Sequence, residues 1–183
     1  MLTEQLGFSS GDIDSEKYTV KLIEEKTLTQ DVTNDKLEEL KDVNDKVAMA
    51  LKEIKKLDDT PLIEKELKVF EVTNEEGEIA YVTRVIIRIT HTDSINDLVV
   101  VEEIPKDVAM YASDIEFLDL TEVLEEDPIV KWNFDHVPKD QAKEFGYSVD
   151  KKLDTVDSTT IAGGNEPSAV AKWIRNLFAK WFN

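Results

Sequence analysis

The stretch LKVFEVTNEEGEIAYVTRVIIRIT, residues 67–90, decides the fold. Its apolar side chains recur at a period of two, which is the pattern of a β-strand with one buried face. One face of the second half carries Ile79, Tyr81, Val85, Ile87 and Ile89. Arg84 and Arg88 fall on the other face, while Asn74 and Gly77 between the halves are turn residues. The sequence therefore predicts a β-hairpin at this point.

Other short runs have the same character. We predict further strands at 18–23, 98–104, 113–118, 128–134 and 145–153. Turn residues separate them, and no helical pattern lies between the later ones. About seven short strands with tight connections favour an antiparallel β-sandwich. The predicted fold class is mainly β.

Three local motifs in these strands carry a resemblance to a known family. They are Ile104-Pro105-Lys106 at a strand end, Asp127-Pro128 before the strand of Trp132, and Tyr147 with Val149 in a closing strand. In this order the motifs resemble the immunoglobulin-like β-sandwich domains near the C-terminal end of archaeal cell-surface and membrane-anchored proteins. The resemblance covers residues 63–153. It implies a domain on the extracellular face of a membrane. We expect this domain to be non-catalytic and predict no cofactor.

A helical pattern interrupts the strands between residues 35 and 57. Leu37, Leu40, Asn44, Val47, Leu51 and Ile54 follow a three-four spacing. The residues after Leu57, Asp-Asp-Thr-Pro, end the pattern. We predict one long inserted helix of about six turns. Its stripe either packs on the protein's own sheet or forms a coiled-coil homodimer, in which Asn44 would occupy a core position.

The composition excludes several classes of function. The chain has 40 acidic and 22 basic residues, a formal net charge of -18, and only three of the basic residues are arginines. Such a charge repels phosphate backbones, so we expect no nucleic-acid partner. The absence of cysteine excludes thiolate nucleophiles and cysteine zinc sites. No run approaches the roughly twenty apolar residues of a membrane-spanning helix, and no export leader is recognisable. We therefore expect an excised soluble domain, or alternatively a cytoplasmic protein.

The C-terminal region reverses the charge. Residues 156–168 are small, polar and glycine-containing, which is typical of a linker. Residues 169–183 hold three basic and no acidic residues, and their apolar side chains fall on one half of a helical wheel. We predict a C-terminal amphipathic helix whose contact residues are Lys172, Trp173, Ile174, Arg175, Leu177, Phe178, Lys180, Trp181 and Phe182. This helix either contacts a membrane surface or a partner protein, or docks on the body of the protein.

Motifs for catalysis or metal binding are weak. His91 and His136 each lie near an Asp, as in many acid-base sites, but this pairing is common in loops. Asp12, Asp14 and Glu16 resemble the opening of a calcium loop. Lys17 and Ile23 stand where such a loop needs Gly and Glu, which excludes a helix-loop-helix site. We predict no catalytic residues, no metal and no enzyme activity.

These patterns divide the chain into five parts. They are an extension at 1–17, a strand and helix at 18–61, the sandwich at 62–155, a linker at 156–168 and the tail at 169–183. Two functions follow. One is a non-catalytic structural or interaction domain of a membrane-associated, cell-surface protein. The alternative is a soluble dimeric partner-binding protein of the cytoplasm, with the helix at 35–57 and the tail as its interfaces.

Overall fold

A computed structural model describes residues 18–30 and 39–168, and its described part is mainly β. Its elements are β1 Tyr18–Gln30, α3 Asp45–Glu53, β2 Leu62–Asn74, β3 Ile79–Thr90, β4 Ile95–Glu103, η1 Ala112–Asp114, β5 Ile115–Phe117, β6 Glu122–Glu125, β7 Ile129–Val137, β8 Lys143–Val149 and β9 Thr159–Asn165. The hairpin of β2 and β3 confirms the prediction from residues 67–90. Its turn forms because Asn74 Oδ1 accepts hydrogen bonds from the N–H groups of Glu76 and Glu78, while Gly77 adopts a φ of 83°.

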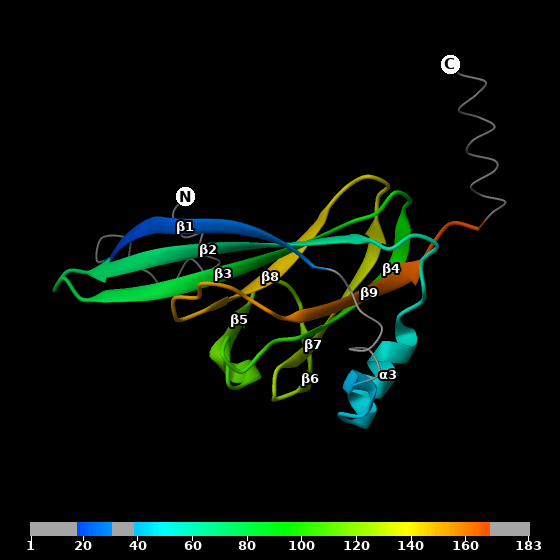
Figure 1. Cartoon of the computed structure of the whole chain (residues 1–183), viewed down its shortest axis with the longest axis horizontal. Helices are drawn as coiled ribbons and strands as arrows, with labels where there is room; N and C mark the ends of the chain where they lie inside the picture. The colour runs from blue at the N-terminus through cyan, green and yellow to red at the C-terminus, as the bar shows by residue number, and fades with distance from the viewer. Residues whose placement is uncertain (1–17, 31–38, 169–183) are drawn as a thin grey trace, which may run out of the picture.

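The strands form two antiparallel sheets that pack face to face (Figure 1). The first sheet has the order β1-β2-β3-β8-β5, and the second has the order β6-β7-β4-β9. The chain passes between the sheets several times, since β3 and β4 are consecutive but belong to different sheets. A sandwich of this kind buries one face of each sheet and leaves the opposite faces for other contacts.

The main core lies between the sheets. Trp132 on β7 and Tyr147 on β8 are fully buried, and the Trp132 ring lies 4.9 Å from the ring of Phe145. Around them are branched aliphatic side chains from β2, β3 and β4. Inward residues of β3 are those with odd numbers from Val85 to Ile89, as the period-two pattern predicts.

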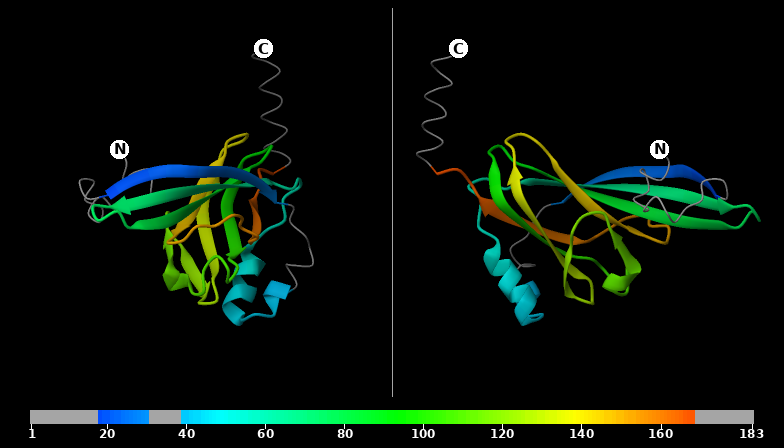
Figure 2. Two further views of the ribbon diagram at one scale, coloured as in Figure 1. Left: turned by 60° about the vertical axis from the view of Figure 1, so that its left-hand side comes forward. Right: turned by 180° about the vertical axis from the view of Figure 1, so that it is seen from behind.

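The first sheet continues beyond the sandwich as a three-stranded arm. β8 pairs with β3 only from Thr83 to Ile89, whereas β2 pairs with β3 as far as Ile79. The outer ends of β1, β2 and β3 therefore project past the second sheet (Figures 1 and 2). β1 was predicted as a strand of six residues and has thirteen, which extends the sheet along its edge.

The predicted linker at 156–168 differs from the structure, because residues 159–165 form β9. This strand pairs with β4, from Asn96↔Asn165 to Glu103↔Thr159. Its two glycines suggested a flexible segment, but they permit close packing instead. A Cβ atom on Gly163 would overlap the carbonyl oxygen of Lys55, which leads out of α3. β6 was also not predicted, since its four residues carry no clear alternation.

The single long helix predicted from Asp35 to Leu57 also differs from the structure. In the described residues a short helical turn at 39–41 ends in a turn at 42–43, and α3 then begins after Asn44. Asn44 Oδ1 accepts a hydrogen bond from the N–H of Val47 at 2.8 Å, and Asn44 Nδ2 donates one to Glu125 at 2.5 Å. The amide is thus an N-cap that starts a new helix. Asn44, which would occupy a core position in a coiled coil, instead interrupts the helix.

Candidate functional site

A buried polar cluster lies between the two sheets and joins Lys65, Glu102 and Ser158. Lys65 is on β2, Glu102 is on β4, and Ser158 directly precedes β9; their exposed fractions are 2%, 0% and 5%. Lys65 Nζ donates to Ser158 Oγ at 2.6 Å and to the Ser158 carbonyl at 2.8 Å. Ser158 Oγ in turn donates to Glu102 Oε1 at 2.5 Å. The same carboxylate oxygen lies 3.3 Å from Lys65 Nζ, which completes a triangle of contacts.

The direction of these hydrogen bonds decides what the cluster can do chemically. A lysine that activates a serine must be neutral and accept its proton. Here the Lys65 ammonium donates to Ser158, and the serine hydrogen is directed to Glu102. Glu102 is therefore the base that Ser158 faces. Because Glu102 has no exposed surface, the pair has no route to a substrate in this conformation.

Further polar atoms surround this cluster. Burial raises the pKa of the Tyr147 phenol well above its usual range, and the negative charge of Glu102 raises it further. Tyr147 is therefore a neutral hydroxyl at any physiological pH. Thr160 pairs with Glu102 across β4 and β9, and both Thr160 Oγ1 and Glu102 Oε2 are buried without a hydrogen-bond partner. The cluster is only partly satisfied, which makes it sensitive to substitution.

One pattern in the sequence indicates this cluster, although the predicted site residues do not include it. Lys65 falls between Ile63 and Leu67 in the inward positions of β2, and Glu102 falls between Val100 and Ile104 along β4. Opposite charges at inward positions of two strands predict a buried ion pair. Ser158 gave no such signal, because its segment was predicted as a linker.

The two histidines have structural contacts and lie in separate environments. His91 is 4% exposed; its Nε2 lies 3.0 Å from the carbonyl of Asp59, and its Nδ1 accepts from the N–H of Asp93 at 3.1 Å. The ring therefore contacts the backbone of Asp59 and of Asp93. Glu166 Oε1 is 3.7 Å from Nε2, so the carboxylate within ion-pair distance of this ring belongs to Glu166, which is distant in sequence. His136 Nδ1 lies 2.8 Å from Asn96 Oδ1 at the surface.

The predicted helix interface packs on the protein itself. Leu40, Val47 and Leu51 are at most 6% exposed, and Ile54 is partly buried beside them. They form a second core with Val101, Leu124, Ile129 and Ile161 on the outward face of the β6-β7-β4-β9 sheet. These side chains are therefore not available to a second copy of the chain. Leu37 lies outside the described residues.

The tail residues 172–182 lie outside the described residues as well. The described chain is held just before them, because Glu166 Oε1 accepts a hydrogen bond from the N–H of Asp58 at 2.7 Å. Asn165 adds contacts to Lys55 and Asp97 at 2.8 Å each. Asn165 and Glu166 are therefore held against the body of the protein.

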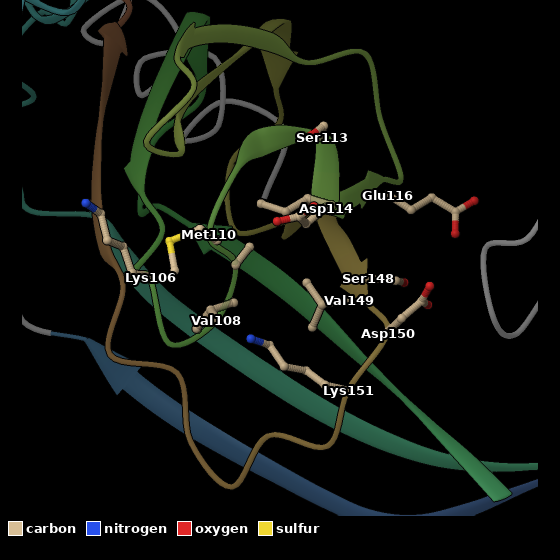
Figure 3. Close-up of a pocket in the computed structure, with 12 residues that line it drawn as sticks. Lys106, Val108, Met110, Ser113, Asp114, Glu116, Ser148, Val149, Asp150 and Lys151 are labelled. Carbon is tan, nitrogen blue, oxygen red and sulfur yellow. The ribbon is translucent and has the colours of Figure 1, made fainter.

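A hollow of about 690 Å³ opens beside the short edge strand β5. Figure 3 shows its mixed lining, with Lys106 and Lys151 on one side and Glu116 and Asp150 on another. Lys106 lies 3.0 Å from Asp127, and Lys151 Nζ donates to the carbonyl of Asp107. No histidine lines this hollow, and neither serine in its lining is hydrogen-bonded to a base within the described residues.

Comparison with known proteins found no matching family model, no matching curated protein and no matching solved structure. Within residues 18–30 and 39–168, no three His, Cys, Asp or Glu side chains are grouped as metal ligands. No helix in the same described ranges has the length and apolar character needed to cross a membrane.

Proposed function

We propose that this protein is a non-catalytic structural or interaction module with an immunoglobulin-like sandwich, carried on the extracellular face of a membrane-associated protein. The observation that carries the non-catalytic part of this proposal is that Lys65, Glu102 and Ser158 are buried and bind one another. Their hydrogen bonds connect β2 of one sheet to β4 and the start of β9 in the other. The side chains best suited to catalysis thus connect the two sheets.

The strand pairing supports the immunoglobulin-like part of this proposal. Immunoglobulin domains have one sheet of strands A-B-E-D and a second built on C and F, which C′ and C″ extend in variable domains. The order β2-β3-β8-β5 corresponds to the first, and β6-β7-β4-β9 corresponds to C″-C′-C-F. The connections differ in two ways. β5 precedes β6 and β7 in the chain, whereas strand D follows C′ and C″, and β6 precedes β7, whereas C″ follows C′. β1 is an addition at the edge.

A serine-reactive probe tests the non-catalytic part. The intact protein is incubated with a sulfonyl fluoride and its mass is measured. We expect no adduct on the folded protein, because Ser158 is closed off between the sheets. A serine hydrolase labelled under the same conditions is the positive control for probe reactivity. An adduct on the folded protein that disappears in Ser158→Ala would contradict the proposal and indicate a nucleophilic serine.

Flotation with lipid vesicles tests the membrane part. The full chain is compared with a full-length variant carrying Trp173→Ser, Phe178→Ser and Trp181→Ser. We expect the wild type to float with anionic vesicles and the variant to stay in the dense fraction, since interfacial helices bind through aromatic and basic side chains. If the wild type does not float with either anionic or neutral vesicles, the membrane part of the proposal is wrong.

A further inference from the structure

One transverse row of side chains crosses the whole outer face of the first sheet. The register places Glu25, Lys68, Arg84, Ser148 and Glu116 next to one another, one on each strand from β1 to β5. All five alternate with core residues, so they lie on the face turned away from the second sheet. Figure 3 shows Glu116 and Ser148 on the side of the sheet opposite Val108.

The cations on this face differ in their partners. Lys68 lies 3.3 Å from Glu25 and 3.2 Å from Glu66. Arg88 lies 2.7 Å from Glu66 and donates to Glu144 at 2.6 Å. In the described part of the chain, Arg84 between them has no carboxylate within ion-pair distance. Lys68 and Arg88 thus each lie beside two carboxylates, whereas Arg84 has none at that distance among the described residues.

Arg84 is nevertheless 92% buried, because its exposed fraction is 8%. Its Nε and Nη2 atoms are buried and have no hydrogen-bond partner. The Ser148 hydroxyl, directly across the strand pair, is also buried and unpartnered at 2% exposure. Burial lowers the pKa of the Arg84 guanidinium, and the charge of Glu116 partly offsets this. Two adjacent strands therefore present unsatisfied donors at one spot.

The two unpartnered nitrogens define the shape of the missing group. Nε–H and Nη2–H point in parallel from one edge of the planar guanidinium, with the spacing of the two oxygens of a carboxylate. A buried guanidinium edge without a partner is costly, and one bidentate anion would satisfy both donors. The Ser148 hydroxyl can rotate to donate a third hydrogen bond.

The surrounding charge favours a singly charged ligand. Arg84 is one cation, and Glu116 and Glu25 flank the row at its two ends. A phosphate dianion would place a net negative charge beside these carboxylates in a chain of net charge -18. A carboxylate would form a neutral pair with Arg84.

We propose that Arg84 and Ser148 form a carboxylate-binding site on the outer face of the first sheet, with Arg84 Nε and Nη2 as a bidentate clamp. The carboxylate is that of a small free acid.

The test uses the side-chain Nε–H signals of nitrogen-labelled full-length protein. Only Arg84, Arg88 and Arg175 contribute, so single Arg→Lys variants assign every signal. Arg88 is the internal reference for a carboxylate-bound Nε–H, since it donates to Glu144. Sodium acetate is titrated against sodium chloride at constant ionic strength, with inorganic phosphate as the comparison anion.

We expect a saturable acetate-dependent shift of the Arg84 signal in the wild type, weakened at least severalfold by Ser148→Ala. The proposal is overturned if the Arg84 signal shows no saturable response to acetate. A stronger response to phosphate than to acetate would also overturn it.

Discussion

Lys65 Nζ lies 2.6 Å from Ser158 Oγ, although β2 and the start of β9 belong to opposite sheets. The contact is the centre of a polar bridge through the main core. Lys65, Glu102 and Ser158 form this bridge, and each side chain contacts the other two. Its energetics can be tested residue by residue.

Removing the serine hydroxyl should destabilise the protein. In Ser158→Ala, Lys65 loses one acceptor and Glu102 loses its hydroxyl donor, both at buried positions. We expect the free energy of unfolding to fall by about 1–3 kcal/mol, measured by urea denaturation. Ser113→Ala at an exposed position is the control and should change it by less than about 0.5 kcal/mol. Equal effects of the two substitutions would contradict the bridge.

The ion pair should show strong coupling between its partners. Lys65→Met leaves Glu102 charged and buried, and should cost about 3–5 kcal/mol of unfolding free energy. Lys65→Met with Glu102→Leu removes both charges and should be less destabilised than the single variant. A double-mutant cycle by urea denaturation measures this. Additive effects would show that the two charges do not interact.

Asn44→Ala distinguishes a capped helix from a continuous one. As an N-cap, Asn44 contributes about 1 kcal/mol, so its loss should lower the unfolding free energy by about 1–2 kcal/mol once the Glu125 contact is included. In a continuous helix the same change would stabilise the protein, because alanine has the higher helix propensity. The sign of the change in unfolding free energy therefore distinguishes a capped helix from a continuous one. Met49→Ala at an exposed position of α3 is the control.

Gly163→Ala tests whether residues 159–165 are a packed strand. The added methyl group would overlap the Lys55 carbonyl, and we expect a loss of about 1–3 kcal/mol in thermal or urea unfolding. A free linker would tolerate the change or gain slightly from reduced chain entropy. Thr155→Ala in the exposed segment before β9 serves as the matched control. Unchanged stability in Gly163→Ala would argue against this strand.

Acid should weaken the outer face of the first sheet through Glu66. Burial raises the pKa of Glu66, but hydrogen bonds with Glu25 and Lys68 and the charge of Arg88 outweigh it and leave the pKa below its usual value. A depressed folded-state pKa gives stability that is complete above the unfolded-state pKa of about 4.3 and is lost as the pH falls through the lower folded-state pKa. Glu66→Gln should therefore flatten the dependence of unfolding free energy on pH in this range. An unchanged slope would contradict the assignment.

The sequence determined the local elements with strong periodicity. Residues 67–90 indicated a hairpin because alternation and turn chemistry act between near neighbours, and the structure has that hairpin. The stripe from Leu40 to Leu51 indicated a helical face in the same way. What covers such a face depends on residues distant in sequence, so the choice between a dimer and an intramolecular core needed the positions of Val101 and Ile161.

Tertiary structure alone decided the elements whose local signals point elsewhere. Asn44 is compatible with a helix interior or a cap, and the capping contact together with Glu125 from β6 selects the cap. Gly163 resembles a linker residue until the Lys55 backbone lies against it. The buried cluster and the Arg84–Ser148 pair likewise arise from register between separate strands. Cross-strand register places these side chains together, and single-strand periodicity carries no information about register between distant strands.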